Sequence, residues 1–236
     1  MKFIIEPEIF RRFPDLIIGV LVAKNLNNES SEQRILDELR NAEISIKEKF
    51  STETLSQAPR IDCWRKAYSS FGAKPKENKS SVESLYRMVL QEKNIKHINK
   101  LVDIYNLISL KHMLPAGGED TDKAKGDIRL AFAGENEPAV LLLGDTEPRP
   151  PHKGEIIYKD DISAICRRWN WREADRTKLT EETKNCIIVI EGLSPANKED
   201  ISAALKELQG LIKKFCNAET EIHILEPEKN ETEITS

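Results

Sequence analysis

The sequence predicts an α+β fold, built as a single domain of mixed β-sheets with flanking helices. Apolar residues recur at helical spacing in several segments. Elsewhere, short β-branched apolar runs lie between turn residues. The chain has 236 residues and no internal repeat or low-complexity linker. We therefore expect one domain over residues 1–225 and a charged, disordered tail over residues 226–236.

Strands are predicted at both ends of the chain and in its second half. Residues 16–23 form a continuous apolar run, as expected of a strand that is covered on both faces. The other predicted strands lie at residues 3–5, 128–132, 139–143, 155–158, 186–190 and 220–225.

Helices are predicted mainly in the first half of the chain. Ser30 with Gln33, and Ser80 with Glu83, fit the capping box that opens a helix. Glycine or proline closes several of the segments. The predicted helices lie near residues 30–46, 63–72, 80–89, 97–110 and 200–215.

Composition and charge exclude several classes of protein. The net charge of −4 argues against bulk nucleic-acid binding, although a local basic patch stays open. No apolar run approaches the roughly 20 residues of a membrane span, and the first residues do not resemble a signal peptide. Four widely spaced cysteines, without a C-x-x-C motif, predict neither disulfides nor a metal site. We expect a cytoplasmic protein with no membrane partner and no cofactor, since no phosphate-binding glycine loop occurs.

Three clusters could carry chemistry. Trp64 and Tyr68 are four residues apart and fit one helical face. They are either a core anchor beside a snorkelling Arg65, or a pocket wall in which Arg65 binds an anion. Gly117-Gly118 follows a predicted helix. It either ends that helix or lets a ligand approach N–H groups that can hold an oxyanion.

The third cluster, residues 167–172, contains three arginines and two tryptophans. As a strand it would place Arg167, Trp169 and Trp171 on one face, and the intervening residues on the other. Such a segment could stack on a ligand while its arginines contact phosphate, or it could be a packed edge strand with salt bridges.

The order of these clusters resembles the freestanding relatives of the editing domain in the phenylalanyl-tRNA synthetase beta subunit (the B-three/B-four module). The resemblance covers about residues 60–192, and its most specific part runs from Asn99 to Asp120. The motifs that carry it are Trp64-Arg65-x-x-Tyr68, Ser80-Ser81-x-Glu83-x-Leu85, Ile98-Asn99-x-Leu101-Val102-Asp103-x-Tyr105-Asn106, Leu114-Pro115-x-Gly117-Gly118-x-Asp120, Gly134-Glu135, Gly154-Glu155 and Arg167-Arg168-Trp169-Asn170-Trp171-Arg172.

The resemblance implies a fold like the synthetase module, with a cleft for the aminoacyl-adenosine end of tRNA. The synthetase domain hydrolyses tRNA-Phe mischarged with tyrosine, without a covalent nucleophile, by positioning a water at the ester. Such a mechanism depends on orientation and oxyanion stabilisation more than on a triad. The absence of a triad motif here is therefore compatible with it.

Two departures from the family pattern reshape the expected pocket. Tyr105 stands where the synthetase has threonine, and Gly117 stands where it has histidine. Specificity for tyrosine is therefore not expected to carry over. The acid that follows a glycine-rich turn in the synthetase corresponds here to Glu173 or Asp175.

On this resemblance, the chain is a candidate trans-acting aminoacyl-tRNA deacylase. The glycine N–H groups would hold the ester carbonyl, the tryptophans would stack on the adenine or the side chain, and the arginines would hold phosphates. The catalytic candidates are Asn106, Gly117, Gly118, Asp120 and Glu173. The substrate-binding candidates are Trp64, Arg65, Tyr105, Arg167, Arg168, Trp169, Asn170, Trp171 and Arg172.

Two alternatives stay open at the level of sequence. One is a module that binds an amino acid, an aminoacyl-adenosine or tRNA without turnover, which would fit the loss of the family's histidine and threonine. The other is a protein-interaction domain, which would need a large exposed apolar patch.

Overall fold

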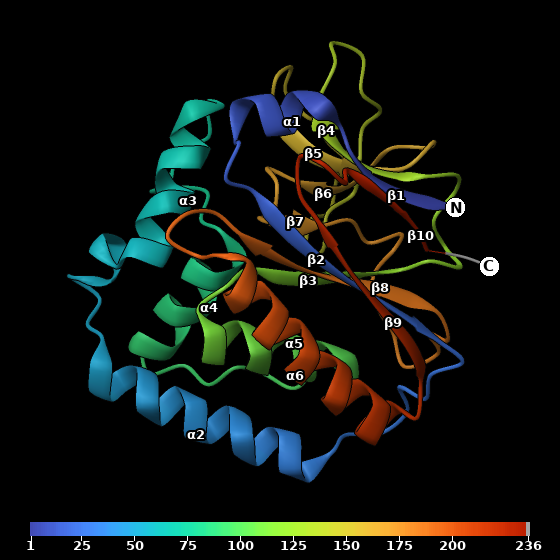
Figure 1. The fold of residues 1–236 in the computed structure, drawn as a ribbon. Coiled ribbons are helices and arrows are strands. Elements are labelled where there is room, and N and C mark those ends of the chain that lie inside the picture. Colours follow the sequence, from blue (N-terminus) through green and yellow to red (C-terminus); the bar gives the residue numbers. More distant parts are fainter. Residues whose placement is uncertain (235–236) are drawn as a thin grey trace.

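Two β-sheets and a layer of helices form the framework of the computed structural model, which describes residues 1–234 (Figure 1). The four-stranded sheet is antiparallel and has the order β3 (Ala116–Asp120), β8 (Cys186–Gly192), β2 (Ile17–Lys24) and β9 (Glu219–Leu225). The six-stranded sheet has the order β10 (Glu231–Glu233), β1 (Lys2–Ile5), β4 (Ile128–Phe132), β5 (Ile156–Lys159), β6 (Ala164–Arg167) and β7 (Arg172–Glu173). It is mixed because β1 and β4 run parallel. The α+β class predicted from the sequence is confirmed.

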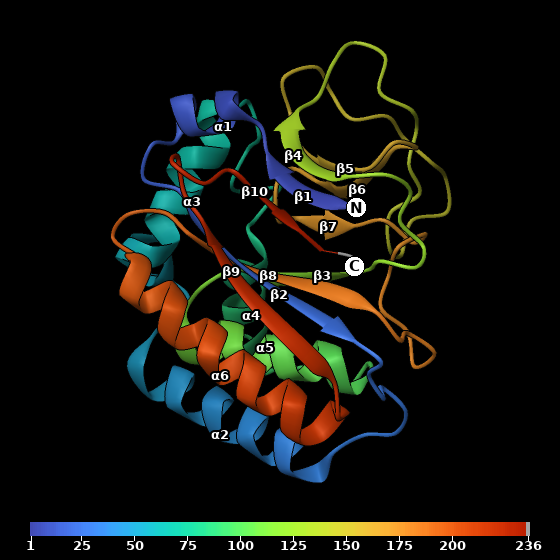
Figure 2. The same cartoon turned by 45° about the vertical axis from the view of Figure 1, so that its right-hand side comes forward.

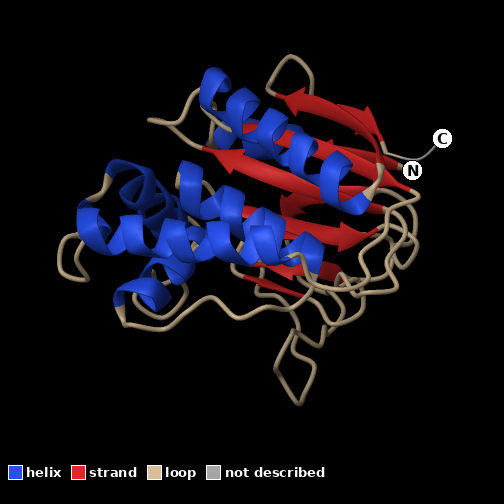
Figure 3. Cartoon of the chain, turned by 90° about the horizontal axis from the view of Figure 1, so that it is seen from below, coloured by secondary structure: helices blue, strands red, loops and turns tan. Residues whose placement is uncertain are grey.

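The helices gather mainly on the side of the four-stranded sheet that faces away from the six-stranded sheet (Figures 1 and 2). Helix α6 packs on β2, β8 and β9, α5 packs against β3 and α6, and α2 lies farther out, against α5. Seen from below, these helices lie in front of the strands (Figure 3). The helices are α1 (Pro7–Arg12), α2 (Gln33–Lys49), α3 (Pro59–Ser70), α4 (Ser81–Leu90), α5 (Lys100–His112) and α6 (Lys198–Cys216), with a 3₁₀ turn at Leu55–Gln57.

The central strand β2 confirms the prediction from its apolar run. All of its residues from Ile18 to Ala23 are buried, Gly19 included. Helix α6 covers one face, and the six-stranded sheet lies toward the other (Figure 2). A strand between two apolar layers has no polar face, so its sequence does not alternate.

Helix α5 is buried from Lys100 to Leu110, because α2, α6 and β3 surround it. The Asn99 side chain accepts a hydrogen bond from the backbone N–H of Val102 at 3.1 Å, which caps its first turn. The helix ends at Met113, which is left-handed with φ 52°. Met113 therefore ends this helix, and Gly117-Gly118 does not.

The start of one predicted helix and one predicted strand differ in the structure. Helix α2 begins at Gln33 with Glu32 as its N-cap, so Ser30 does not cap it. Residues 139–143 make only isolated bridges, in which Val140 pairs with Arg149 and Leu142 pairs with Ala174. Turn residues on both sides leave this run too short for a ladder.

The predicted disordered tail is also wrong over most of its length. Residues 231–233 form β10, which pairs antiparallel with β1 and extends the six-stranded sheet. The charged residues Glu231 and Glu233 remain exposed at this edge, where a strand needs only one apolar face. Residues 235–236 of the predicted tail lie outside the described part of the chain.

Candidate functional site

A pocket of about 240 Å³ lies between the two sheets, beside helices α4 and α5. Strands β3 and β8 form one wall, and β5, β6 and β7 face them. Its lining is mostly apolar at depth, where Phe3, Ile128 and Ile165 have no exposed surface. Both Gly117-Gly118 and the segment from Trp169 to Arg172 line it, so the structure brings these two distant stretches together.

The two glycines lie inside strand β3, which is an edge strand. A Cβ atom on Gly118 would lie 2.9 Å from the carbonyl oxygen of Ile187, and one on Gly117 would lie 3.0 Å from Oε1 of Glu173. Gly118 therefore excludes a side chain, because the backbone of Ile187 cannot move aside. Gly117 has no side chain, which leaves room for the Glu173 carboxylate.

The two glycine N–H groups face in different directions. Glu191 donates its N–H to the Pro115 carbonyl at 3.0 Å, and bonded and non-bonded pairs alternate along an antiparallel ladder. Gly117, opposite Val189, is therefore in the bonded set, and Gly118, opposite Ile188, is not. The N–H of Gly118 has no partner on β8 and donates to Oε1 of Glu173 at 3.4 Å. Only Gly118 thus offers an N–H to the pocket side, and it serves the Glu173 carboxylate.

The arginine–tryptophan segment is a tight turn between β6 and β7, so the predicted continuous strand is wrong. Arg168 and Trp169 both have positive φ, at 47° and 67°. The turn breaks the expected alternation of faces. Trp169 is fully buried against Trp64, with ring centroids 5.0 Å apart, while Trp171 is half-buried at the pocket wall.

Glu191, buried near the end of the apolar strand β8, fixes this turn. Its carboxylate accepts hydrogen bonds from Nε1 of Trp169 at 2.8 Å, from Nδ2 of Asn170 at 2.5 Å and from the Tyr158 hydroxyl. Asn170 in turn accepts from the Tyr68 hydroxyl at 2.9 Å. Burial raises the pKa of Glu191 to about 7, although its three donors oppose the shift. The network joins α3, β5 and β8 to the turn.

The three arginines of the segment have separate surroundings. Arg167 is buried and donates twice to Glu155, at 2.8 and 2.7 Å, outside the pocket. The Arg168 guanidinium lies 4.4 Å from the centre of the Trp171 ring, and that of Arg172 lies 5.2 Å from it. Arg172 also pairs with Asp145 at 2.8 Å. Trp171 and its two arginines therefore form one cationic, aromatic strip beside the pocket.

Two further carboxyl groups line the pocket, on Glu119 and Glu173. Burial raises the pKa of Glu173 to about 7, against the hydrogen bond from Gly118, which lowers it. Burial, and next the charge of Glu173, raise the pKa of Glu119 well above its ordinary value. A carboxyl group that titrates near neutral pH can take and release a proton under ordinary conditions.

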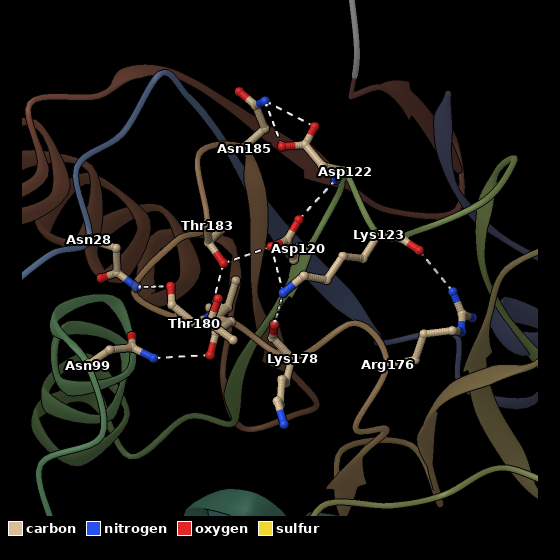
Figure 4. A network of polar contacts seen from close by, with 11 residues as sticks. Asn28, Asn99, Asp120, Asp122, Lys123, Arg176, Lys178, Thr180, Thr183 and Asn185 are labelled. Carbon is tan, nitrogen blue, oxygen red and sulfur yellow. Dashed lines mark hydrogen bonds and ion pairs between the residues drawn. The ribbon is translucent and has the colours of Figure 1, made fainter.

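Five of the residues predicted for the site lie outside the pocket lining, among them Trp64, Arg65 and Asp120. Trp64 is a core residue, and Arg65 pairs with the buried Glu83 at 2.7 Å. Asp120 follows the diglycine but faces a polar network at the end of β3 (Figure 4). There its Oδ2 accepts from the Thr183 hydroxyl at 2.7 Å, and its Oδ1 accepts from the N–H of Asp122 at 3.0 Å.

The other predicted residues divide into two that lie outside the pocket lining and nine that belong to it. Arg167 and Arg168 also do not line the pocket. The predicted residues that do line it are Tyr105, Asn106, Gly117, Gly118, Trp169, Asn170, Trp171, Arg172 and Glu173.

Sequence reasoning did not select Glu191, Tyr158 or Glu119 as site residues. For Glu191 a signal was present, because a carboxylate inside the apolar run Cys186–Gly192 is costly unless it has partners. Tyr158 carried no such signal, since a tyrosine in a buried strand is ordinary.

Neither a membrane helix nor a metal-binding group is found in residues 1–234. No helix there is long and apolar enough to cross a bilayer. Nor do three or more His, Cys, Asp or Glu side chains converge as metal ligands in that range.

Comparison with known proteins shows the family. No curated protein matches the chain. Among solved structures, the chain is similar to an N-terminal fragment of the phenylalanyl-tRNA synthetase beta subunit from Pyrococcus horikoshii, with 13% identity and a TM-score of 0.42. That match covers 92% of this chain and 49% of the fragment, so the chain spans about half of the fragment's length. The B3/4 domain model matches residues 63–217, which confirms the resemblance seen in the motifs. The chain therefore belongs to the B3/4 domain family.

Proposed function

We propose that this protein hydrolyses the ester of an aminoacyl-tRNA, acting in trans on the aminoacyl end. The observation that carries the proposal is Glu173, a carboxyl group with a pKa of about 7, held by the Gly118 N–H in a largely apolar pocket. Membership of the B3/4 domain family supports the choice of tRNA as the substrate class.

The size of the pocket favours an aminoacyl group. About 240 Å³ holds roughly eight waters at about 30 Å³ each. This is below the roughly 300–1,000 Å³ of pockets that enclose drug-sized ligands. An amino-acid side chain with its ester carbonyl fits such a volume, whereas the adenosine and the rest of the tRNA would stay outside.

In this proposal Glu173 is the general base. Its carboxylate takes a proton from water while the water oxygen bonds to the ester carbonyl carbon. The bond from that carbon to the ribose oxygen then breaks, and the ribose oxygen receives the proton from Glu173. The products are the free amino acid and the tRNA with a free hydroxyl. Asn106, a buried amide on the pocket wall, supplies a donor for the carbonyl oxygen.

The strip formed by Trp171, Arg168 and Arg172 suits the part of the tRNA that stays outside. An exposed ring can stack on a base, and guanidinium groups can pair with phosphate. Arg167 is not available for this contact, because Glu155 occupies it in the interior.

The test is to incubate the protein with a panel of aminoacyl-tRNAs and to follow loss of the ester. We expect hydrolysis of at least one of them, and a loss of about 100-fold or more in rate for Glu173→Gln. Glu135→Gln is a matched control, since Glu135 is an exposed carboxylate paired with Lys153 and does not line the pocket.

Two results would contradict the proposal. One is full activity in Glu173→Gln. The other is tight binding of an aminoacyl-tRNA with no loss of ester, which would instead identify a non-catalytic binding module.

A further inference from the structure

One carboxylate oxygen in the pocket has no partner. Glu119 is 7% exposed and lies on the same face of β3 as Gly117, toward the pocket that it lines. Within residues 1–234, its Oε2 is buried and accepts no hydrogen bond. The Thr177 hydroxyl and the charge of Arg176 both lie near enough to lower the pKa of Glu119. The Thr177 hydroxyl is itself buried without a hydrogen-bond partner, so it leaves Oε2 unsatisfied. A buried polar atom without a partner is costly and rare, so a donor from outside the chain is the natural partner.

The surroundings of Glu119 favour a cation as that donor. The charge of Glu173 acts on the Glu119 carboxyl more strongly than any other charge, and Glu191 also lines the pocket. Among the described lining residues, Arg172 is the single cationic side chain, and it pairs with Asp145. Arg176, close to Glu119, pairs with Asp160 at 2.8 Å. The pocket thus has an excess of carboxyl groups whose neighbouring cations already have other partners.

We propose that the pocket binds its ligand through an ammonium group, which donates to Glu119 and lies beside Glu173. The carboxyl groups do not converge as a metal site within the described residues, which favours an ammonium over a metal ion. The identification of this ammonium as the α-amino group of an aminoacyl ester rests on the proposed function. In an aminoacyl ester, one α-carbon separates the amine from the ester carbonyl. An amine bound to Glu119 would therefore hold the ester carbonyl near Glu173, the neighbouring carboxyl group in the pocket.

This arrangement assigns different parts of the ligand to different parts of the pocket. Glu119 and Glu173 take the amine and the water that attacks the ester. The side chain then extends along the remaining lining, where Val189, Ile165 and Phe3 are apolar. At the far end Glu191 is already occupied by three donors, so it offers no strong site for a second ammonium. We therefore expect ligands with an apolar side chain.

The test measures binding by calorimetry with the full chain and uses no turnover. A panel of amino-acid amides is compared with matched acyl amides that lack the α-amine. We expect the α-amine to strengthen binding by about tenfold to hundredfold, the range of a charge-assisted hydrogen bond in a buried site. Equal affinity for both members of each pair, or no binding by any amide, would overturn the proposal.

A second ligand pair separates the two possible sources of the ammonium. Lysine amide and norleucine amide share the α-amine and differ in the side-chain amine. Similar affinity, or weaker binding of the lysine compound, supports the α-amine. A marked preference for lysine amide would overturn this assignment.

A variant tests the residue itself. Glu119→Gln keeps the shape of the side chain but cannot ionise to pair with an ammonium group. We expect the advantage of the α-amine to disappear while the des-amino ligand binds as before. Glu135→Gln serves as the surface control. Because these measurements follow binding, they can fail while ester hydrolysis is observed, and hydrolysis can fail while the amine preference is observed.

Discussion

The Glu173 carboxylate occupies the space that a side chain on Gly117 would need, since a Cβ atom there would lie 3.0 Å from Oε1. Gly117→Ala therefore should move the flexible end of Glu173 and leave the backbone in place. We expect hydrolysis to fall by about tenfold or more, with a stability within about 1 kcal/mol of wild type. Ester-release kinetics and urea unfolding of the same preparation measure the two quantities.

Gly118→Ala is the matched contrast. Its Cβ would meet the Ile187 carbonyl oxygen at 2.9 Å, and backbone cannot yield as a side chain does. We expect a loss of about 1–3 kcal/mol in the free energy of unfolding. A Gly118→Ala protein as stable as Gly117→Ala would contradict this account of the two glycines.

The rate of hydrolysis should depend on pH through Glu173. Its pKa is raised to about 7, and the base acts only as the carboxylate. We therefore expect kcat/KM to rise with pH below about 7 and to level off above it. A rate profile between pH 5 and 9 measures this. A flat profile, or the same inflection in Glu173→Gln, would exclude Glu173 as the titrating group.

The free energy of unfolding should fall as pH rises, whereas the rate of hydrolysis rises. Burial raises the folded-state pKa of Glu191 and Glu173 to about 7, so the folded protein holds protons that the unfolded chain has already released. The stabilisation is complete below their ordinary pKa and is lost as pH rises toward about 7. We expect the free energy of unfolding to fall by up to about 3 kcal/mol per group over this window. Urea unfolding at several pH values tests this, and Glu191→Gln should reduce the slope.

The buried ion pair between Arg167 and Glu155 should matter for stability rather than for tRNA. Arg167→Ala leaves a buried carboxylate without its partner, for which we expect a loss of about 3–5 kcal/mol. Lys153→Ala removes an exposed pair with Glu135 and should cost less than about 1 kcal/mol. Thermal or chemical unfolding compares the two variants. Similar losses in both would show that burial of the first pair has no energetic consequence.

Alanine variants of Asp120 and Asn170 should differ in what they change: the first should lower stability, and the second should lower turnover. Asp120→Ala breaks the bond to Thr183 at the end of β3, so we expect a loss of about 1–3 kcal/mol in stability but nearly normal turnover by the folded fraction. Asn170→Ala removes a donor from Glu191 and should reduce turnover as the turn loosens. Activity normalised to the folded fraction measures both. A large loss in Asp120→Ala alone would reverse these assignments.

Local pattern determined much of the fold. The apolar run of β2, the Asn99 and Ser80 side chains before α5 and α4, and the spacing in α6 each specify an element without reference to the rest of the chain. Local chemistry is sufficient there, because propensity, capping and burial agree.

Other features needed the tertiary structure. Gly117-Gly118 has the composition of a turn, but pairing with β8 makes it a strand. Residues 167–172 alternate like a strand, but Glu191 holds Trp169 in a left-handed turn.

The sequence by itself determined the α+β class, the main helices and strands, and which two stretches were candidates for a pocket. Only the tertiary structure decided which of their side chains face that pocket and which, like Arg167 and Asp120, face partners elsewhere. The direction of a side chain depends on backbone pairing between distant segments. The pKa of each carboxyl group depends on burial among such segments, and neither can be read from neighbouring residues alone.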